Sequence, residues 1–148
     1  MKQATVKNER KYELIKEATI TVEGNKLYRV KALKDSKFFK AGDIGGYIEK
    51  VENLSMFDDA WVSGDAHVFG DAQVHGQMDI ITVLDIGSER GCLTIHRDSA
   101  IGVRVTRGCF TGSIGEFLNA VELTHGDNIH GKIYKSLIET AKIQFGLE

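Results

Sequence analysis

The chain has 148 residues, of which 42% are hydrophobic and 27% charged, and its formal net charge is −2. This composition is ordinary for a globular chain of one domain or two small ones, and the weak negative charge argues against non-specific binding to nucleic acid or to an anionic membrane surface. No apolar run approaches the roughly 20 residues that span a bilayer, and the N-terminal stretch lacks the apolar core of a secretory leader.

The first part of the chain predicts a polar arm followed by a β-hairpin. Residues 1–10 are mostly polar and charged, and we expect them to be mobile. Residues 19–22 and 27–33 alternate between apolar and polar side chains, and residues 23–26 have the composition of a turn between them. We therefore assign residues 1–43 to an N-terminal arm and hairpin cap.

A repeat of six residues organises the middle of the chain, where VSGDAH, VFGDAQ and VHGQMD follow one another from residue 62 to 79. Each unit starts with valine and has glycine at its third place, and the first two share aspartate and alanine next. An inward aliphatic, a turn glycine and a small corner residue at a period of six are typical of a parallel β-helix. In phase with these repeats, residues 44–79 make six hexads, or about two coils of three sides. Because so few repeats bury little surface, we expect caps and self-association.

The second half predicts a C-terminal βββαα domain over residues 80–148. Its three strands, which form an antiparallel meander, are expected at 80–86, 93–97 and 101–107. Ser113 and Glu116 have the spacing of a capping box at a helix start. Apolar side chains at helical spacing then indicate two helices that cover one face of the sheet, namely Ile114, Phe117, Leu118 and Val121, and Ile133, Leu137, Ile138, Ala141 and Phe145.

A candidate ligand site follows from the other face of that meander. Alternation places Thr94, His96, Arg104 and Thr106 on the side away from the helices. The glycine-containing loop after Arg107 leads into a helix, whose free N–H groups and positive dipole end suit phosphate or carboxylate. The predicted ligand-binding residues are His96, Arg97, Arg104, Thr106, Arg107, Gly108, Thr111, Gly112 and Tyr134. The alternative is a solvated sheet face with turn glycines.

The histidines and cysteines allow other chemistry. His67 and His75 lie on the repeat, where one of them could act as a general base, although their places in the hexad more often face solvent. Cys109 beside Arg107 could be a reactive thiol. Because Cys92 and Cys109 stand outside any CxxC spacing, we favour two buried thiols in a reducing cytoplasm.

Two further clusters have competing interpretations. His125, Asp127 and His130 could ligate a metal, but capping of the second helix by Asp127 is the simpler expectation, and we predict no metal. Aromatic side chains at outward positions of the repeat predict an apolar patch that contacts another subunit. This patch would consist of Tyr47, Trp61 and Phe69.

Several runs of the sequence resemble small hexapeptide-repeat proteins encoded by phages and prophages. These runs are 11–14, 27–33, 40–48, 53–55, 107–112 and 124–127. The resemblance implies a left-handed β-helix and a threefold assembly. The expected fold class is thus mainly β with C-terminal α: a short left-handed parallel β-helix, preceded by a hairpin and followed by the βββαα domain.

The leading functional hypothesis is non-enzymatic binding. Small oligomeric phage proteins that sequester nucleotide immune signals of bacteria resemble this chain in size and in lacking catalytic residues. We therefore expect a homo-oligomer, as a trimer, in the host cytoplasm, without a cofactor. It would bind an anionic, nucleotide-like ligand such as a cyclic dinucleotide or an ADP-ribose derivative. The alternatives are a protein-interaction module trimerised by its β-helix and an acyl-CoA-dependent transferase that uses His67 or His75.

Overall fold

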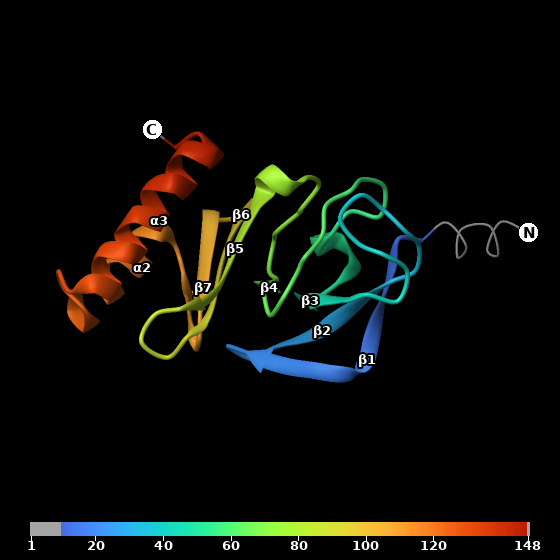
Figure 1. Cartoon of the computed structure of the whole chain (residues 1–148), viewed down its shortest axis with the longest axis horizontal. Coiled ribbons are helices and arrows are strands. Elements are labelled where there is room, and N and C mark those ends of the chain that lie inside the picture. Colours follow the sequence, from blue (N-terminus) through green and yellow to red (C-terminus); the bar gives the residue numbers. More distant parts are fainter. Residues whose placement is uncertain (1–9, 148) are drawn as a thin grey trace, which may run out of the picture.

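The computed structural model describes residues 10–147, which form two open four-stranded sheets with two helices at the C-terminal end (Figure 1). The first sheet has the strand order β1-β2-β3-β4 and the second the order β5-β6-β7-β8. The predicted arm lies almost wholly outside the described residues. The first sheet comprises β1 (Tyr12–Val22), β2 (Asn25–Ala32), β3 (Ile44–Ile48) and β4 (His67–Val68), with the 3₁₀ helices η1 (Val51–Asn53) and η2 (Gln77–Asp79) in the same half. The second comprises β5 (Ile80–Ile86), β6 (Gly91–Asp98), β7 (Gly102–Arg107) and β8 (Phe110–Gly112), followed by α2 (Ile114–Thr124) and α3 (Ile129–Phe145).

The predicted hairpin is confirmed. β1 and β2 are antiparallel, and Val22 pairs with Asn25 across a two-residue turn. Both turn residues, Glu23 and Gly24, have positive φ (51° and 83°), as the tight hairpin turns that match strand twist require. β1 begins earlier than expected, at Tyr12, and its register shifts between Ile15 and Thr19.

The prediction of a β-helix is wrong. The parallel pairing of the repeat is limited to two residue pairs between β3 and β4 and one isolated bridge between Leu54 and Val74. Tyr47 pairs with His67 and Leu54 with Val74, so paired positions are 20 residues apart. Because 20 is not a multiple of six, successive hexads do not stack in register, and most of the repeat runs as loops against the first sheet.

The hexad side chains still point inward, which explains why the pattern is so regular. Its valines (Val62, Val68 and Val74) and its alanines (Ala60, Ala66 and Ala72) are all buried. They pack in one core with side chains of the first sheet, among them Tyr12, Val30 and Ile48. Glycines in β3 allow this close approach, since a Cβ at Gly45 would lie 2.4 Å from the carbonyl oxygen of Val62. The period of six therefore indicates which side chains are buried, but it does not indicate that the hexads stack as coils.

Asn53 joins the repeat to the first sheet through a fully buried amide. Its Oδ1 accepts hydrogen bonds from the backbone N–H groups of Glu49 and Lys50, both at 3.1 Å. Its Nδ2 donates to the carbonyl oxygens of Gly70 and Ala72, at 3.2 and 3.0 Å. One side chain thus bonds four buried backbone groups, of which the N–H of Glu49 also donates to the carbonyl oxygen of Val68 at 3.2 Å.

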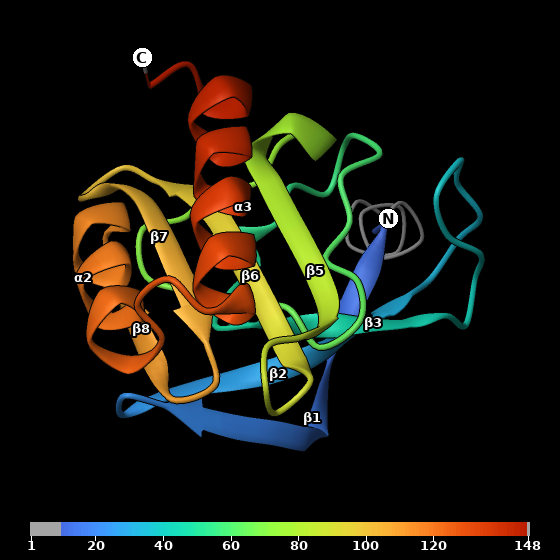
Figure 2. The ribbon, with the colours of Figure 1, turned by 60° about the vertical axis from the view of Figure 1, so that its left-hand side comes forward.

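The C-terminal half confirms the predicted meander and both helices. β5, β6 and β7 are antiparallel neighbours, and β8 adds a fourth strand that the sequence did not indicate. The capping box is present, because Ser113 Oγ accepts from the N–H of Glu116 and Glu116 accepts from the N–H of Ser113. α2 and α3 cover one face of this sheet over a core that includes Leu93, Val105 and Ile138 (Figure 2). No helix within residues 10–147 has the length and apolarity to cross a membrane.

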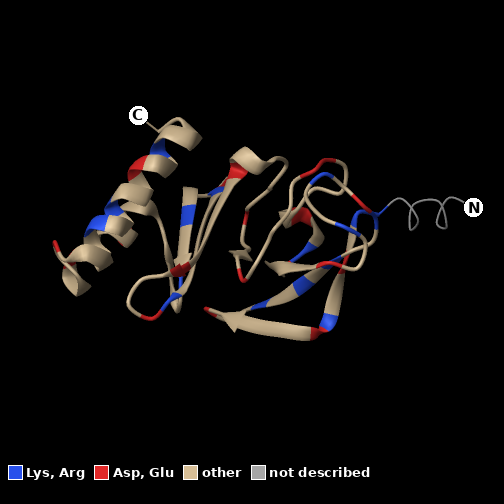
Figure 3. Cartoon of the chain, viewed as in Figure 1, with Lys and Arg blue, Asp and Glu red and all other residues tan. Residues whose placement is uncertain are grey.

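Charge is distributed unevenly between the two halves (Figure 3). Residues 10–50 carry ten Lys or Arg and six Asp or Glu, whereas residues 51–147 carry seven and 13. The positive excess therefore belongs to the first sheet, and the residues predicted to bind an anion lie in the more acidic part of the chain.

We predict that Asn53→Ala lowers the free energy of unfolding by about 2–4 kcal/mol, because four buried hydrogen bonds are lost and each such bond contributes about 0.5–1.5 kcal/mol. Urea unfolding followed by circular dichroism measures this change. The control is Asn119→Ala, the same substitution at an exposed position of α2, which should shift stability by no more than about 0.5 kcal/mol. Equal effects of the two changes would contradict the role assigned to Asn53.

Candidate functional site

The sheet face predicted to bind a ligand is not open to solvent. Thr94, His96 and Thr106 lie on the face away from the helices, as expected, but each is at most 1% exposed. The expectation of an uncovered face was therefore wrong. The hexad segment that contains β4 lies between the two sheets and covers it (Figure 1).

The covering contacts join the backbone of the repeat to side chains of the second sheet. The N–H of His67 donates to Thr94 Oγ1 at 3.0 Å, and the hydroxyl of Ser99, in the turn after β6, donates to the carbonyl oxygen of Asp71 at 3.2 Å. The guanidinium of Arg104 lies over the ring of Phe69, 5.0 Å from its centroid. We call this buried contact the polar seam, and its members on the second sheet are Thr94, His96, Asp98, Arg104 and Thr106.

Arg104 and Thr111 of the predicted site are joined within the polar seam. Arg104 Nε donates to Asp98 Oδ2 at 3.2 Å, and Arg104 Nη1 donates to Thr111 Oγ1 at 3.1 Å. The hydroxyls of Thr106 and Thr111 share a hydrogen bond of 3.2 Å. Burial by itself would raise the pKa of Asp98, but hydrogen bonds from the N–H of Ala100 and from Arg104 outweigh it and lower that pKa. These groups satisfy one another and leave little for a ligand.

Within the polar seam, His96 has a buried ring nitrogen that lacks a hydrogen-bond partner in residues 10–147. Its Nδ1 lies 2.9 Å from the carbonyl oxygen of Arg97, which places the proton on Nδ1. Its Nε2 is buried without a hydrogen-bond partner among the described residues. Burial lowers the pKa of His96 to about 4, so the imidazole is neutral near pH 7.

The predicted phosphate loop is a strand. Gly108 (φ 59°) and Cys109 form a tight turn between Arg107 and Phe110, and β8 then pairs with β7. The start of α2 is already capped by its own Ser113 and Glu116, and the Glu116 carboxylate lies beside Gly112. Cys109 is exposed rather than buried, and Cys92 is half-buried. The N–H of Glu116 is therefore used within the fold, and the Glu116 carboxylate takes the place at the helix start where an anion was expected.

Arg97 lies away from the other predicted residues. Its Nε donates to Asp79 Oδ1 at 2.9 Å, its Nη1 donates to the carbonyl oxygen of Phe145, and its guanidinium lies 4.9 Å from the centroid of the Phe145 ring. It joins η2 to the end of α3. This position indicates a structural contact between elements.

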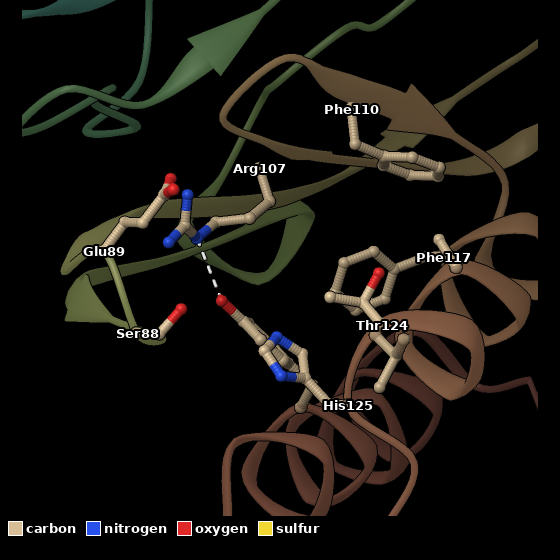
Figure 4. A pocket seen from close by; sticks show the side chains of 10 residues that line it. Ser88, Glu89, Arg107, Phe110, Phe117, Thr124 and His125 are labelled. Atoms are coloured by element: carbon tan, nitrogen blue, oxygen red, sulfur yellow. Dashed lines mark hydrogen bonds between the residues drawn. The ribbon is translucent and has the colours of Figure 1, made fainter.

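A pocket on the helical side of the second sheet contains the remaining two predicted side chains, Arg107 and Tyr134 (Figure 4). Its volume is about 240 Å³. The turn between β5 and β6 forms one side, and β8 with the two helices forms the other. The full lining is Ser88, Glu89, Arg107, Phe110, Phe117, Ala120, Val121, Thr124, His125 and Tyr134.

Arg107 is held in a fixed position within this pocket. Its Nε donates to the Tyr134 hydroxyl at 2.9 Å, and its Nη2 donates to the carbonyl oxygen of Ile86 at 3.0 Å. Two glycines make room, because a Cβ at Gly91 would lie 2.5 Å from Arg107 Nη1 and a Cβ at Gly87 would lie 2.1 Å from the Tyr134 hydroxyl oxygen. The guanidinium is thus positioned by the turn on one side and by α3 on the other.

Aromatic rings form the opposite wall. Phe110 and Phe117 have ring centroids 5.5 Å apart, and Phe117 meets Tyr134 edge-on at 5.4 Å. The His125 ring lies 5.9 Å from that of Tyr134. The hydroxyls of Ser88 and Thr124 and the carboxylate of Glu89 complete the lining (Figure 4). This combination suits binding of a flat ring attached to an anionic group.

Sequence reasoning found only part of this pocket. Arg107 and Tyr134 were predicted, but Phe110 and Phe117 were not assigned to a site, and His125 was considered only as a possible metal ligand. Phe117 was expected only as a core residue of its helix. The turn residues Ser88 and Glu89 had no sequence feature that connects them to helices more than 20 positions later.

The alternative sites are not assembled as expected. His67 packs edge-on against Tyr47, with ring centroids 5.7 Å apart, and burial lowers its pKa, while His75 is exposed. Asp127 faces Lys135 at 3.1 Å, and Asn128 caps α3 in its place. Trp61 and Phe69, expected on an outward patch, are buried in the core. Within residues 10–147, no group of three or more His, Cys, Asp or Glu side chains is placed to hold a metal ion.

Comparison of the chain with models of protein families, with curated proteins and with solved structures gave no match. The pocket and the polar seam are therefore identified from the geometry of this chain alone.

We predict that the free energy of unfolding falls by about 3 kcal/mol between about pH 6.5 and about pH 4, because the pKa of His96 is lower in the folded state (about 4) than in the unfolded state. Protonation then favours the unfolded chain, and the loss levels off below about pH 4. Urea titrations at several pH values measure it. The difference in pH dependence of stability between wild type and His96→Leu separates the contribution of the His96 imidazole from that of the carboxylates.

The control for this prediction is His75→Leu, which removes an exposed imidazole and should keep the wild-type pH dependence. A wild-type slope retained in His96→Leu would show that His96 is not the group responsible.

Proposed function

We propose that the chain is a non-enzymatic binding protein for an anionic, nucleotide-like ligand, which it holds in the pocket between the β5–β6 turn and the two helices. The observation that supports this most directly is Arg107, fixed by two hydrogen bonds beside a wall of aromatic rings. An arginine next to aromatic side chains matches a phosphate attached to a base.

Arg107 retains donors for such a ligand. A guanidinium has five N–H groups, and the bonds of Arg107 to Tyr134 and Ile86 use Nε and Nη2. Within the described residues, Nη1 has no hydrogen-bond partner. Because Nη1 and Nη2 lie on the same planar group, an oxyanion can approach them without displacing the anchors.

The aromatic wall provides the second element of recognition. Phe110 and His125 are both only partly buried and line the pocket, so part of each ring is accessible to a planar ligand. Stacking of a base on an aromatic side chain contributes about 1–3 kcal/mol. Since the cavity is about 240 Å³, below the roughly 300–1,000 Å³ of pockets that enclose drug-sized ligands, it would hold one base and one phosphate. The rest of a larger ligand would lie outside.

Glu89 sets the charge selectivity of the pocket. Its carboxylate lies on the same side as Arg107 (Figure 4) and disfavours a small, highly charged anion by repulsion. It also offers an acceptor to the amino group of a base. Together, Glu89 and Arg107 favour a ligand with both a phosphate and a donor-bearing ring over inorganic phosphate. Sequestration of an immune signal would need affinity without turnover.

We predict that calorimetric titration detects binding of at least one member of a panel of cyclic dinucleotides, nucleoside monophosphates and ADP-ribose derivatives. Arg107→Gln should weaken this binding at least about tenfold, through loss of a charged hydrogen-bond donor. The matched control is Arg90→Gln, which removes an exposed arginine of the same turn and should bind as the wild type does. Absence of heat with every member, or chemical conversion of one, would refute the proposal.

We further predict that Glu89→Gln raises the affinity for inorganic phosphate relative to wild type, because it removes the repulsive charge beside Arg107. The gain should shrink with added salt, since the site is open to solvent. Competition of phosphate against the bound nucleotide measures it. Because Glu89 is exposed, stability should not change, and unchanged phosphate affinity would place the carboxylate outside the site.

A further inference from the structure

α3 carries a second apolar stripe in addition to the one that packs on the sheet. Ile129, Ile133 and Ile143 are exposed by 68%, 41% and 72%. Ser136 and Thr140 lie between them, so the five positions follow one another at intervals of four and three residues. This spacing places all five on one side of a helix.

The exposed stripe is opposite the buried one. The buried positions of α3 are Gly131, Tyr134, Ile138, Ala141 and Phe145. At 3.6 residues per turn, their mean direction is roughly opposite that of the exposed stripe. In Figure 2, α3 lies in front of the second sheet, and no other described element covers its outer side. A helix that is apolar on two sides is typical of one that packs between two layers.

The charges beside the stripe identify its partner. Lys132 and Glu139 lie on the same flank of the helix, seven residues apart. In an antiparallel pair of identical helices, each flank faces the same flank of the other copy, so Lys132 of one copy meets Glu139 of the other, twice. The second flank carries His130, Leu137 and Gln144 and no acidic side chain. In a parallel pair, Lys132 and Glu139 would face these residues, and the opposite charges would no longer meet.

We propose that α3 forms an antiparallel, two-fold contact with α3 of a second copy of this chain, centred on Ser136. Ile129 precedes Ser136 by seven residues and Ile143 follows it by seven, so the two isoleucines meet across the axis. Lys132 and Glu139 lie four residues before and three after, in the same register. The small side chain of Ser136 at the crossing point lets the backbones approach closely.

The size of the contact makes the dimer weak. One helix on each side buries less surface than the roughly 1,200–2,000 Å² of stable complexes, so a dissociation constant in the micromolar range or above is expected. A two-fold contact closes on itself, and it predicts a dimer rather than the trimer that the family resemblance implies. The contact uses the outer side of α3 and leaves the proposed ligand pocket free.

Sedimentation equilibrium over a hundredfold range of protein concentration tests this inference on the full chain. Wild type should shift reversibly between monomer and dimer. Ile143→Lys should weaken the dimer at least about tenfold, by placing a charge in the apolar contact. The matched control is Leu84→Lys, which changes another exposed apolar side chain outside α3 and should dimerise as the wild type does.

The pairing of Lys132 with Glu139 across the antiparallel contact is tested by reversing these charges. Lys132→Glu should weaken the dimer, because two glutamates then face each other at each end, and the double change Lys132→Glu with Glu139→Lys should restore it. A chain that stays monomeric at every concentration, a trimer, or a dimer that is insensitive to Ile143→Lys would overturn the proposal. Failure of the double change to restore the dimer would overturn the antiparallel register.

Discussion

Burial of the polar seam is the constraint on which the rest of the structure depends. The second sheet has an apolar face under the helices and a face that carries threonines, an imidazole and the Asp98–Arg104 pair. Such a face can be buried only if its hydrogen bonds are satisfied. The backbone of the hexad segment and the ring of Phe69 provide that cover. The two sheets are therefore joined through polar contacts with defined partners, and the repeat lies between them.

This burial determines where a ligand can bind. The seam uses Arg104, Thr106 and Thr111 for internal contacts, so these groups are already bonded within the fold. Arg107 is three positions after Arg104 on the same strand, so strand alternation directs its guanidinium to the other side, where the β5–β6 turn and α3 hold it. A shift of three positions along one strand thus separates a structural arginine from one that can meet a ligand. The pocket and the outer side of α3 are then separate surfaces, one for a small molecule and one for a second copy.

Much of the local structure was predictable from the residues. The hairpin, the meander, both helices and the Ser113–Glu116 capping box depend on contacts between residues close in sequence, and local patterns indicate such contacts directly. The hexad pattern also marked Val62, Val68 and Val74 correctly as inward-facing. It did not indicate what they face, since inward positions at a period of six arise equally from stacked coils and from loops wrapped on a sheet.

The sequence by itself thus determined that the valines and alanines of the repeat face inward, where the first C-terminal helix begins and which strands are neighbours along the chain, because each depends on short-range periodicity and capping. Only the tertiary structure decided that the polar sheet face is covered and that Arg107 meets Tyr134. It also decided that Asn53 bonds across to Gly70 and Ala72. These contacts join residues 17 to 27 positions apart, and their partners follow from how the sheets pack, which no local pattern records.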